Sequence, residues 1–206
     1  THTHAAMCLL RSYADDLKLH EWLEKHIWPI EAKLTPEDCF WGVKLACIEM
    51  IKTGTTCFSD MYWSAYETAK AVYESGIRAV ISPAFIDLGN EEKWEKFLKE
   101  GKNAIKKINE LKCERIKASL GPHAIYTLSE EHLQFIKEWS EKENLLINFH
   151  LSETKEEVEN CMKLHKKRPV EYLKDINFLG ENLIAAHVNW VNEREIKILA
   201  KHNVKI

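Results

Sequence analysis

Two histidines separated by one residue open the chain, in the motif Thr1-His2-Thr3-His4. Along a β-strand, residues two apart point to the same face, so His2 and His4 can bind one metal ion if this segment is extended. On a helix the two side chains would diverge. A His-x-His motif at a terminus is also typical of a solvated pair or of a tag remnant. The motif therefore predicts a metal site only if other ligands can be found to join it.

Three further histidines follow short runs that are typical of buried strands. His123 follows Leu120-Gly121-Pro122, while His150 and His187 each end an apolar run. In a closed barrel of parallel strands, all carboxyl ends meet at one face, whereas an open sheet would spread them apart. The strand-end histidines therefore favour a barrel with a site at that face. The remaining histidines fall within predicted helices, where surface or packing roles are expected: His20, His26, His132, His165 and His202.

The elements that must position these residues alternate regularly. Thr35-Pro36-Glu37-Asp38 is a strong helix start, and that helix is expected to run to about Thr53, before Gly54. Further helices are predicted at 65–75, within 91–110, after Ser129, after His150 with a break at Pro169, and after Asn192. Strands are predicted at 55–60, 78–83, 116–121, 145–150, 183–187 and 204–206.

This alternation predicts parallel strands joined by crossover helices, in an open doubly wound sheet or a closed barrel. The positions of the histidines at strand ends favour the closed form, an α/β (β/α)8 TIM-like barrel. With 206 residues, of which 45% are hydrophobic, the chain fits one domain better than two.

Composition excludes several classes of protein. The net charge is −3, and 29 basic and 32 acidic residues are interspersed, without the basic stripe that a nucleic-acid backbone requires. No apolar run approaches the length of a membrane span and no signal peptide opens the chain, so we expect a soluble cytoplasmic protein that binds neither nucleic acid nor membrane. The six cysteines never form a Cys-x-x-Cys or Pro-Cys motif. A metal must therefore be held by nitrogen and carboxylate ligands.

A longer ordered set of motifs extends over nearly the whole chain. It comprises Thr1-His2-Thr3-His4 with Met7, Leu10 and Arg11, then Ala14-Asp15-Asp16-Leu17, Glu21-Trp22-Leu23, Pro29-Ile30-Glu31, Gly54-Thr55-Thr56, Asp60-Met61-Tyr62, Leu120-Gly121-Pro122-His123, His150-Leu151-Ser152-Glu153-Thr154 and Ala185-Ala186-His187. With these motifs the chain resembles the amidohydrolase superfamily. Within it, the resemblance is to the deaminases of 5'-methylthioadenosine and S-adenosylhomocysteine and to the 5'-deoxyadenosine deaminases.

The resemblance implies a metal site and a hydrolytic deamination of the adenine ring. His2, His4 and His150 would bind one divalent metal, zinc or alternatively iron, which would make hydroxide available near neutrality. That hydroxide would attack the ring carbon that bears the amino group, and ammonia would leave. Glu153 would act as general acid/base, and His187 would hydrogen-bond the hydroxide or the tetrahedral intermediate.

The resemblance also implies how the substrate binds. Glu31 would accept hydrogen bonds from the ribose hydroxyls, His123 would contact the base, and His150 belongs to the residues that face the substrate. A small-molecule nucleoside is the expected partner, and a homo-oligomer is a possible assembly.

Each of these residues also has a structural interpretation. Glu31 would be an exposed helical charge near Lys33, and Glu153 would be a first-turn acid that favours the next helix. His123 would shape a turn, and His187 would be a core histidine bound to backbone. Taken one by one, the structural interpretations rank ahead; the joint pattern favours function.

Two departures from the family pattern affect the expectation. The segment Ile81–Phe85 has no Arg that could bind the carboxylate of a homocysteine tail, and the following loop offers only Lys93. This favours nucleosides with small or uncharged 5' groups over S-adenosylhomocysteine.

The family's last metal ligand, an Asp on the eighth strand, is expected beyond Ile206. We therefore expect residues 1–206 to be a barrel fragment without its last strands and without the small flanking β-domain.

Three functional hypotheses follow from these observations. The first is an adenine nucleoside deaminase. The second is an amidohydrolase acting on another aminated or chlorinated heterocycle, such as guanine, cytosine or a triazine, which the ribose-binding role of Glu31 disfavours. The third is an inactive truncated barrel.

Overall fold

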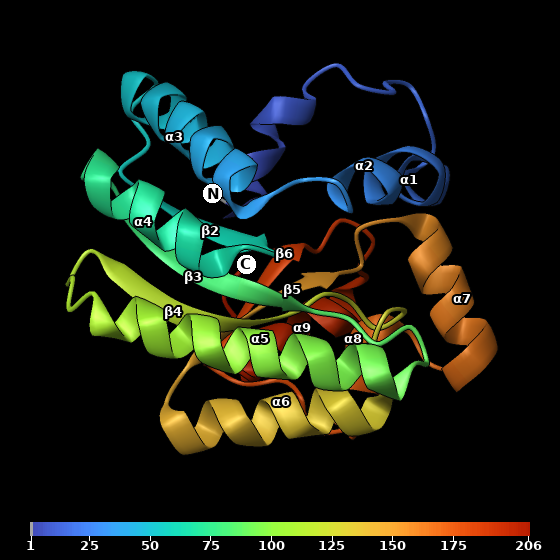
Figure 1. Cartoon of the computed structure of the whole chain (residues 1–206). Coiled ribbons are helices and arrows are strands. Elements are labelled where there is room, and N and C mark those ends of the chain that lie inside the picture. The colour runs from blue at the N-terminus through green and yellow to red at the C-terminus, as the bar shows by residue number, and fades with distance from the viewer. Residues whose placement is uncertain (1) are drawn as a thin grey trace.

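The computed structural model describes residues 2–206, so Thr1 of the opening motif lies outside the described residues. Six strands form one sheet, and every neighbouring pair is parallel. Their order in the sheet is their order in the chain: β1 (His2–Thr3), β2 (Cys57–Tyr62), β3 (Arg78–Phe85), β4 (Ile116–Pro122), β5 (Leu146–Leu151) and β6 (Leu183–His187) (Figure 1).

This strand order distinguishes the two topologies that the sequence left open. A doubly wound sheet reverses its order at a switch point, whereas the wall of a barrel adds each new strand on the same side of the previous one. The order β1 to β6 has no reversal, and the strands curve into a nearly closed barrel. The expected TIM-barrel architecture is therefore confirmed, as a partial domain.

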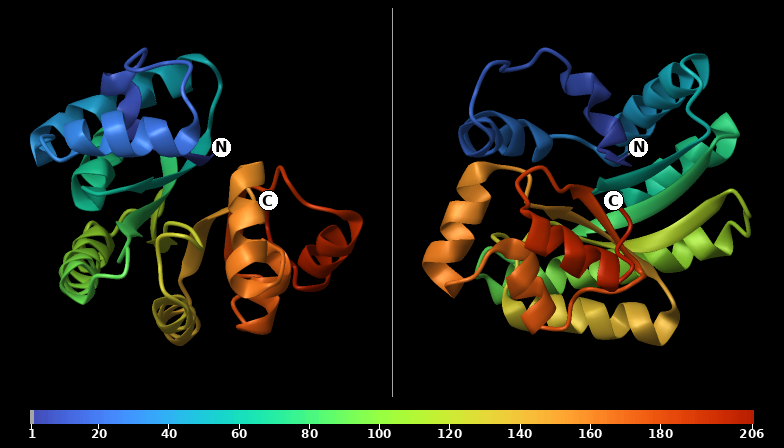
Figure 2. Two further views of the ribbon diagram at one scale, coloured as in Figure 1. Left: turned by 90° about the vertical axis from the view of Figure 1, so that its right-hand side faces the viewer. Right: turned by 180° about the vertical axis from the view of Figure 1, so that it is seen from behind.

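The helices that connect successive strands lie on the outer side of the curved sheet (Figures 1 and 2). The crossover helices are α3 (Pro36–Lys52), α4 (Ala65–Ser75), α5 (Glu91–Glu110), α6 (Glu130–Glu143), α7 (Lys155–His165), α8 (Pro169–Asp175) and α9 (Glu193–Lys201). The segment between β1 and α3 contains four short helical turns: η1 (Ala5–Leu10), α1 (Leu19–Trp22), η2 (Leu23–Ile27) and α2 (Trp28–Glu31). No helix in the range 2–206 has both the length and the apolar character needed to span a bilayer.

Local capping explains where the predicted helices begin and end. Thr35 and Asp38 form a reciprocal capping box at the start of α3, and Gly76 ends α4 with a φ of 79°. Such a left-handed backbone costs glycine little because it has no Cβ. Ser129 and Asn192 cap the helices that the sequence assigned to them. These ends fix the lengths of the loops that lead into and out of each strand.

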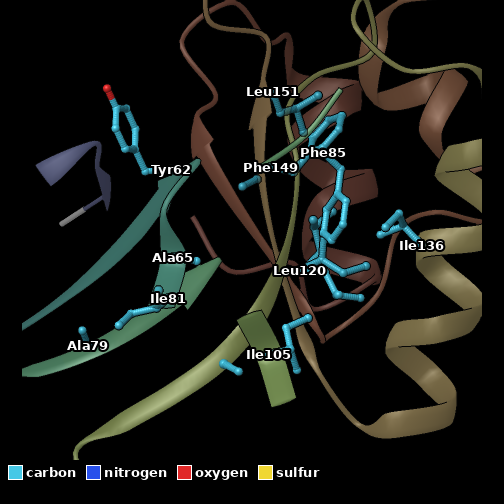
Figure 3. Packing of buried hydrophobic residues seen from close by; sticks show 14 of the residues in the cluster. Tyr62, Ala65, Ala79, Ile81, Phe85, Ile105, Leu120, Ile136, Phe149 and Leu151 are labelled. Carbon is cyan, nitrogen blue, oxygen red and sulfur yellow. The ribbon is translucent and has the colours of Figure 1, made fainter. Parts of the chain in front are cut away.

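The hydrophobic core lies between the sheet and its helices. Phe85 of β3, Leu120 of β4 and Phe149 of β5 are fully buried and pack toward helix residues such as Ile105 and Ile136 (Figure 3). Because side chains alternate along a strand, the opposite face carries different residues. Small polar side chains occupy this inner face below the histidines and are buried: Ser59, Ser82, Ser119 and Asn148.

The strands predicted at 78–83, 116–121 and 145–150 differ from β3, β4 and β5 by one or two residues at their ends, and two other predicted strands differ more. The second strand begins at Cys57 rather than Thr55, because the Thr55 N–H is bound by the Met50 carbonyl in the turn that ends α3. The strand extends to Tyr62, two residues past its predicted end, and Met61 and Tyr62 border the cavity described below. The strand predicted at 204–206 is reduced to one bridge between Ile184 and Lys205. His202 lies just past the end of α9 rather than within it.

Candidate metal centre and active site

Three histidines meet at the carboxyl ends of the strands. His2 lies on β1, His4 follows two residues later, and His150 lies on β5. One ring nitrogen from each falls within 4.8 Å of the other two. The Nε2 atom of His2 is 2.9 Å from that of His150 and 3.4 Å from that of His4. Strand pairing produces this cluster, because β1 and β5 belong to one parallel sheet whose ends converge.

The opposite ring nitrogen of each histidine is held by an acceptor. His4 Nδ1 lies 2.7 Å from the Met61 carbonyl, and His150 Nδ1 lies 2.9 Å from the carbonyl of His123. His2 Nδ1 lies 3.3 Å from Oδ1 of Asn148. These acceptors place the proton on Nδ1 and leave an unprotonated Nε2 on each ring.

This arrangement fits a divalent cation. Three Nε2 lone pairs face one another at distances where two acceptors repel unless a positive charge lies between them. Burial lowers the pKa of His4 and His150, and burial together with the charges of His4 and His187 lowers that of His2 to about 4. The rings are therefore neutral at neutral pH, which is the form that binds zinc or iron.

A carboxylate and a fourth histidine lie beside this cluster. Glu153 follows β5 and His187 ends β6, and the Glu153 carboxylate is 3.6 Å from His187 Nε2. The His187 ring centroid is 5.4 Å from that of His150 and 5.8 Å from that of His2. Burial raises the pKa of Glu153 above its ordinary value, which favours a carboxyl group that both takes up and releases a proton. The structure thus brings both expected catalytic residues to the histidine cluster.

The two residues expected to contact the substrate lie at the same cavity. His123 follows β4 and its Nδ1 lies 3.1 Å from the Thr127 hydroxyl, and burial lowers its pKa to about 3. Glu31 ends α2 and accepts a hydrogen bond of 3.3 Å from Nε1 of Trp63. Burial raises the pKa of Glu31. Glu31 is therefore not the exposed helical charge of its structural interpretation.

A cavity of about 290 Å³ joins these groups. Its wall includes all of the predicted site residues, which are His2, His4, Glu31, His123, His150, Glu153 and His187. A volume of this order, with apolar walls and a few polar groups, is typical of a small-ligand site. The cavity wall also includes five aromatic residues to which the sequence analysis gave no role in the site: Trp22, Trp28, Tyr62, Trp63 and Tyr126.

Part of this omission could have been avoided. Trp63 directly follows β2, and Tyr126 lies a few residues after β4, so the strand-end signal that selected the histidines applies to them as well. Trp22 and Trp28 lie in the short turns between β1 and α3, where no hydrophobic periodicity points to a cavity.

A second cavity, of about 450 Å³, adjoins the first. The two share Trp28, Glu31 and Trp63 in their walls, and the second also includes Lys93 and Lys96 of α5. Lys93 therefore does not line the histidine cavity itself. It lines the space on the far side of Glu31.

The amidohydrolase family profile matches residues 1–206. A 5'-deoxyadenosine deaminase from Methanoregula boonei is 48% identical over 206 residues, which is 100% of this chain and 47% of that protein. A 5-methylthioadenosine/S-adenosylhomocysteine deaminase 1 from Archaeoglobus fulgidus is also 48% identical, over 100% of this chain and 48% of its own length. The chain thus spans about half the length of the curated relatives it matches.

Among solved structures, an adenosine deaminase from Xanthomonas campestris with bound zinc superimposes with a TM-score of 0.90 and 30% identity. The match covers 98% of this chain and 46% of that protein. The family profile extends over every residue, and the fold and the strand-end histidines agree with it. The chain belongs to the amidohydrolase family.

Proposed function

We propose that the full-length protein is a metal-dependent hydrolase that deaminates adenine nucleosides. The observation that carries the proposal is the set of three converging Nε2 atoms beside the Glu153–His187 pair, in one cavity with Glu31. The names of the relatives, which refer to 5'-deoxyadenosine, 5-methylthioadenosine and S-adenosylhomocysteine, support the substrate class.

In this proposal His2, His4 and His150 hold one divalent metal. Three neutral imidazoles suit zinc best, with iron as the alternative, and the solved adenosine deaminase carries zinc. When bound, the ion lowers the pKa of water and so supplies a hydroxide nucleophile near neutral pH. The acceptors on Nδ1 keep each ring in the tautomer and orientation that this role requires.

Glu153 moves the protons of the reaction. Its carboxylate takes a proton from the attacking water and delivers one to a nitrogen of the adenine ring, which makes the adjacent amino-bearing carbon more electrophilic. The water oxygen adds to that carbon. The remaining proton of this water then passes to the amino group through Glu153, and the C–N bond breaks, so that ammonia leaves and a ring carbonyl remains. His187, 3.6 Å from Glu153, hydrogen-bonds the oxygen as it adds to the ring.

The nucleoside is recognised at the opposite wall. Glu31 accepts hydrogen bonds from the ribose hydroxyls, and its own position is fixed by Trp63. His123 and Tyr126, whose ring centroids are 5.9 Å apart, contact the base. Aromatic side chains suit the flat faces of an adenine ring.

We expect a preference for nucleosides with a small or uncharged 5' group. Residues Ile81–Phe85 provide no Arg, and the loss of a charge-assisted bidentate contact typically forfeits about 1.5–3 kcal/mol, or roughly one to two orders of magnitude in kcat/KM. The protein should therefore turn over 5'-deoxyadenosine, 5'-methylthioadenosine or adenosine more efficiently than S-adenosylhomocysteine. A preference for S-adenosylhomocysteine would show that another cation binds its carboxylate.

The test of the function is a set of steady-state assays on the full-length protein. Four nucleosides and free adenine are compared for the wild type, Glu153→Gln and Glu31→Ala. Glu153→Gln should keep its metal and lose about 10²- to 10⁴-fold in kcat, because proton transfer is removed while size is kept. Glu31→Ala should weaken nucleoside turnover. Near-normal turnover by Glu153→Gln would contradict the role of this residue, and faster turnover of free adenine than of the nucleosides would contradict the nucleoside assignment.

A further inference from the structure

A second glutamate holds the segment that carries Glu153. Glu157 lies in the first turn of α7, and only 3% of its surface is exposed. One carboxylate oxygen accepts a hydrogen bond of 2.8 Å from the Ser152 N–H, and the other accepts one of 2.8 Å from the Glu153 N–H. The Glu157 N–H in turn donates to the Thr154 hydroxyl, at 3.1 Å. Both oxygens of this buried carboxylate therefore bind the backbone next to the proposed proton donor.

The bound segment has an unfavourable backbone conformation. Ser152 has a φ of 49°, in the left-handed region that residues other than glycine rarely adopt. A conformation of this kind persists only when the surrounding contacts fix it. The two hydrogen bonds to Glu157 supply such contacts, because they bind the N–H groups on both sides of the turn.

The same segment is bound to the loop that follows β6. The Ser152 carbonyl accepts hydrogen bonds from the N–H groups of Asn189, at 3.1 Å, and Trp190, at 3.0 Å. The Asn189 side chain donates to the Glu153 carbonyl, at 3.2 Å. This loop follows His187, the last residue of β6, whose φ of 72° is also left-handed. The position of Glu153 relative to His187 thus depends on backbone contacts that meet at Ser152.

We propose that Glu157 is a positioning residue that fixes the Ser152–Glu153 backbone and so holds the Glu153 carboxyl group against His187. The proposal rests on the function proposed above for Glu153. A general effect of negative charge at the start of α7 would give the same role to Glu156, which occupies the first turn as well. Glu156 is exposed, whereas the carboxylate of Glu157 is buried and points back at the two N–H groups.

The matched pair Glu157→Gln and Glu156→Gln tests this role in the full-length metal-loaded protein. Each variant replaces a carboxyl group in the same helix turn by an amide, but only in Glu157→Gln does the new NH2 group take the place of an oxygen that accepts from a backbone N–H. We expect Glu157→Gln to lower kcat about 10- to 100-fold while KM and metal content stay within about twofold, because a displaced proton donor affects the chemical step. Glu156→Gln should behave as the wild type.

A second measurement does not depend on the reaction. Hydrogen exchange of the Ser152 and Glu153 amides should be faster in Glu157→Gln, by about tenfold or more, and unchanged in Glu156→Gln. If neither variant changes kcat or these exchange rates, the positioning role is wrong. If the wild type deaminates no nucleoside but the exchange rates change as expected, the proposed function fails while the constraint that Glu157 places on the segment stands.

Glu157→Asp covers the case in which Glu157→Gln does not fold. It keeps the charge but shortens the side chain by one methylene, so the carboxylate retreats from the two N–H groups. Its kcat should fall with unchanged KM. A folded Glu157→Asp protein with wild-type kcat and wild-type amide exchange would overturn the proposal.

Discussion

Two buried histidines, His150 and His132, show how differently the same side chain is used in two regions of this molecule. His132 on α6 is 8% exposed and His150 on β5 is 3% exposed. His132 Nδ1 lies 2.7 Å from a carboxylate oxygen of Asp87, and its ring stacks on Trp94 with a centroid distance of 3.9 Å. His150 Nδ1 is bound by a carbonyl, and its Nε2 faces another imidazole nitrogen at 2.9 Å.

The difference lies in whether the polar atoms find their partners within the chain. Asp87 accepts further hydrogen bonds from the N–H groups of Gly89 and Ser129. The carboxylate of the Asp87–His132 pair therefore has its hydrogen-bond partners within the chain. At His150 the surroundings fix the ring but leave its lone pair directed at two other lone pairs. A buried polar pair that the fold satisfies stabilises structure, whereas several buried acceptor atoms that converge without donors indicate a cation site.

The largest effect is expected from a substitution that removes one ligand of the histidine cluster. In the full-length protein, His4→Ala should lower metal affinity by more than about 100-fold, because removing a ligand costs more than removing its supporting hydrogen bond. His132→Ala should leave metal affinity unchanged. Metal content by mass spectrometry and competition with a chelator measure both. Full metal binding by His4→Ala would contradict the metal role of the histidine cluster. Loss of metal by a folded His132→Ala protein would contradict the purely structural role of His132.

A smaller effect is expected from the acceptor behind His2. Asn148→Ala removes the oxygen that lies 3.3 Å from His2 Nδ1 and should weaken metal binding about 10- to 100-fold. Ser119→Ala is a matched control, since Ser119 is buried on the same inner face but pairs with Ser82 instead. Titration with a metal indicator checks both variants. Equal affinities for the two would mean that the tautomer of His2 does not depend on Asn148.

The Asp87–His132 pair should affect stability and not metal binding. Asp87→Asn removes the charge that binds His132 and the Gly89 and Ser129 amides, and it should lower the free energy of unfolding by about 1–2 kcal/mol. Urea unfolding of wild type and variant measures this difference. A loss of metal affinity in the folded variant would indicate that the pair also supports the site.

The smallest effect is the pH dependence of that stabilisation. Burial by itself would raise the pKa of Asp87, but the hydrogen bonds from His132 and from the two amides outweigh it and hold the pKa below 3.8. A carboxyl group with a lowered pKa in the folded state stabilises the fold above its unfolded pKa, and this contribution disappears as the pH falls through the folded pKa. The stability difference between wild type and Asp87→Asn should therefore be constant above about pH 5 and shrink below about pH 4. Urea unfolding across this range checks it, and a constant difference would contradict the lowered pKa.

Much of the fold and part of the candidate site could be predicted from the sequence, because they depend on local patterns. The spacing of His2 and His4 places both on one face of an extended segment, since side chains alternate along a strand. Caps such as Thr35 and stops such as Gly76 mark helix ends by local hydrogen bonding and backbone freedom. The alternation of strands and helices limits the topology to parallel sheets, and strand ends that carry His123, His150 and His187 favour a barrel.

Only the tertiary structure decided which groups meet. Met61, Asn148 and the His123 carbonyl support the three histidines because strand register places them there, as in the pairing of His2 with Ser59. His2 and His150 are separated by 148 residues, and no local propensity encodes their contact. The same is true of Asp87 and His132, 45 residues apart, whose pairing separates a structural histidine from the cluster. Local patterns fix the direction of each side chain along its element, whereas contacts between elements depend on how the strands align and on how the loops close.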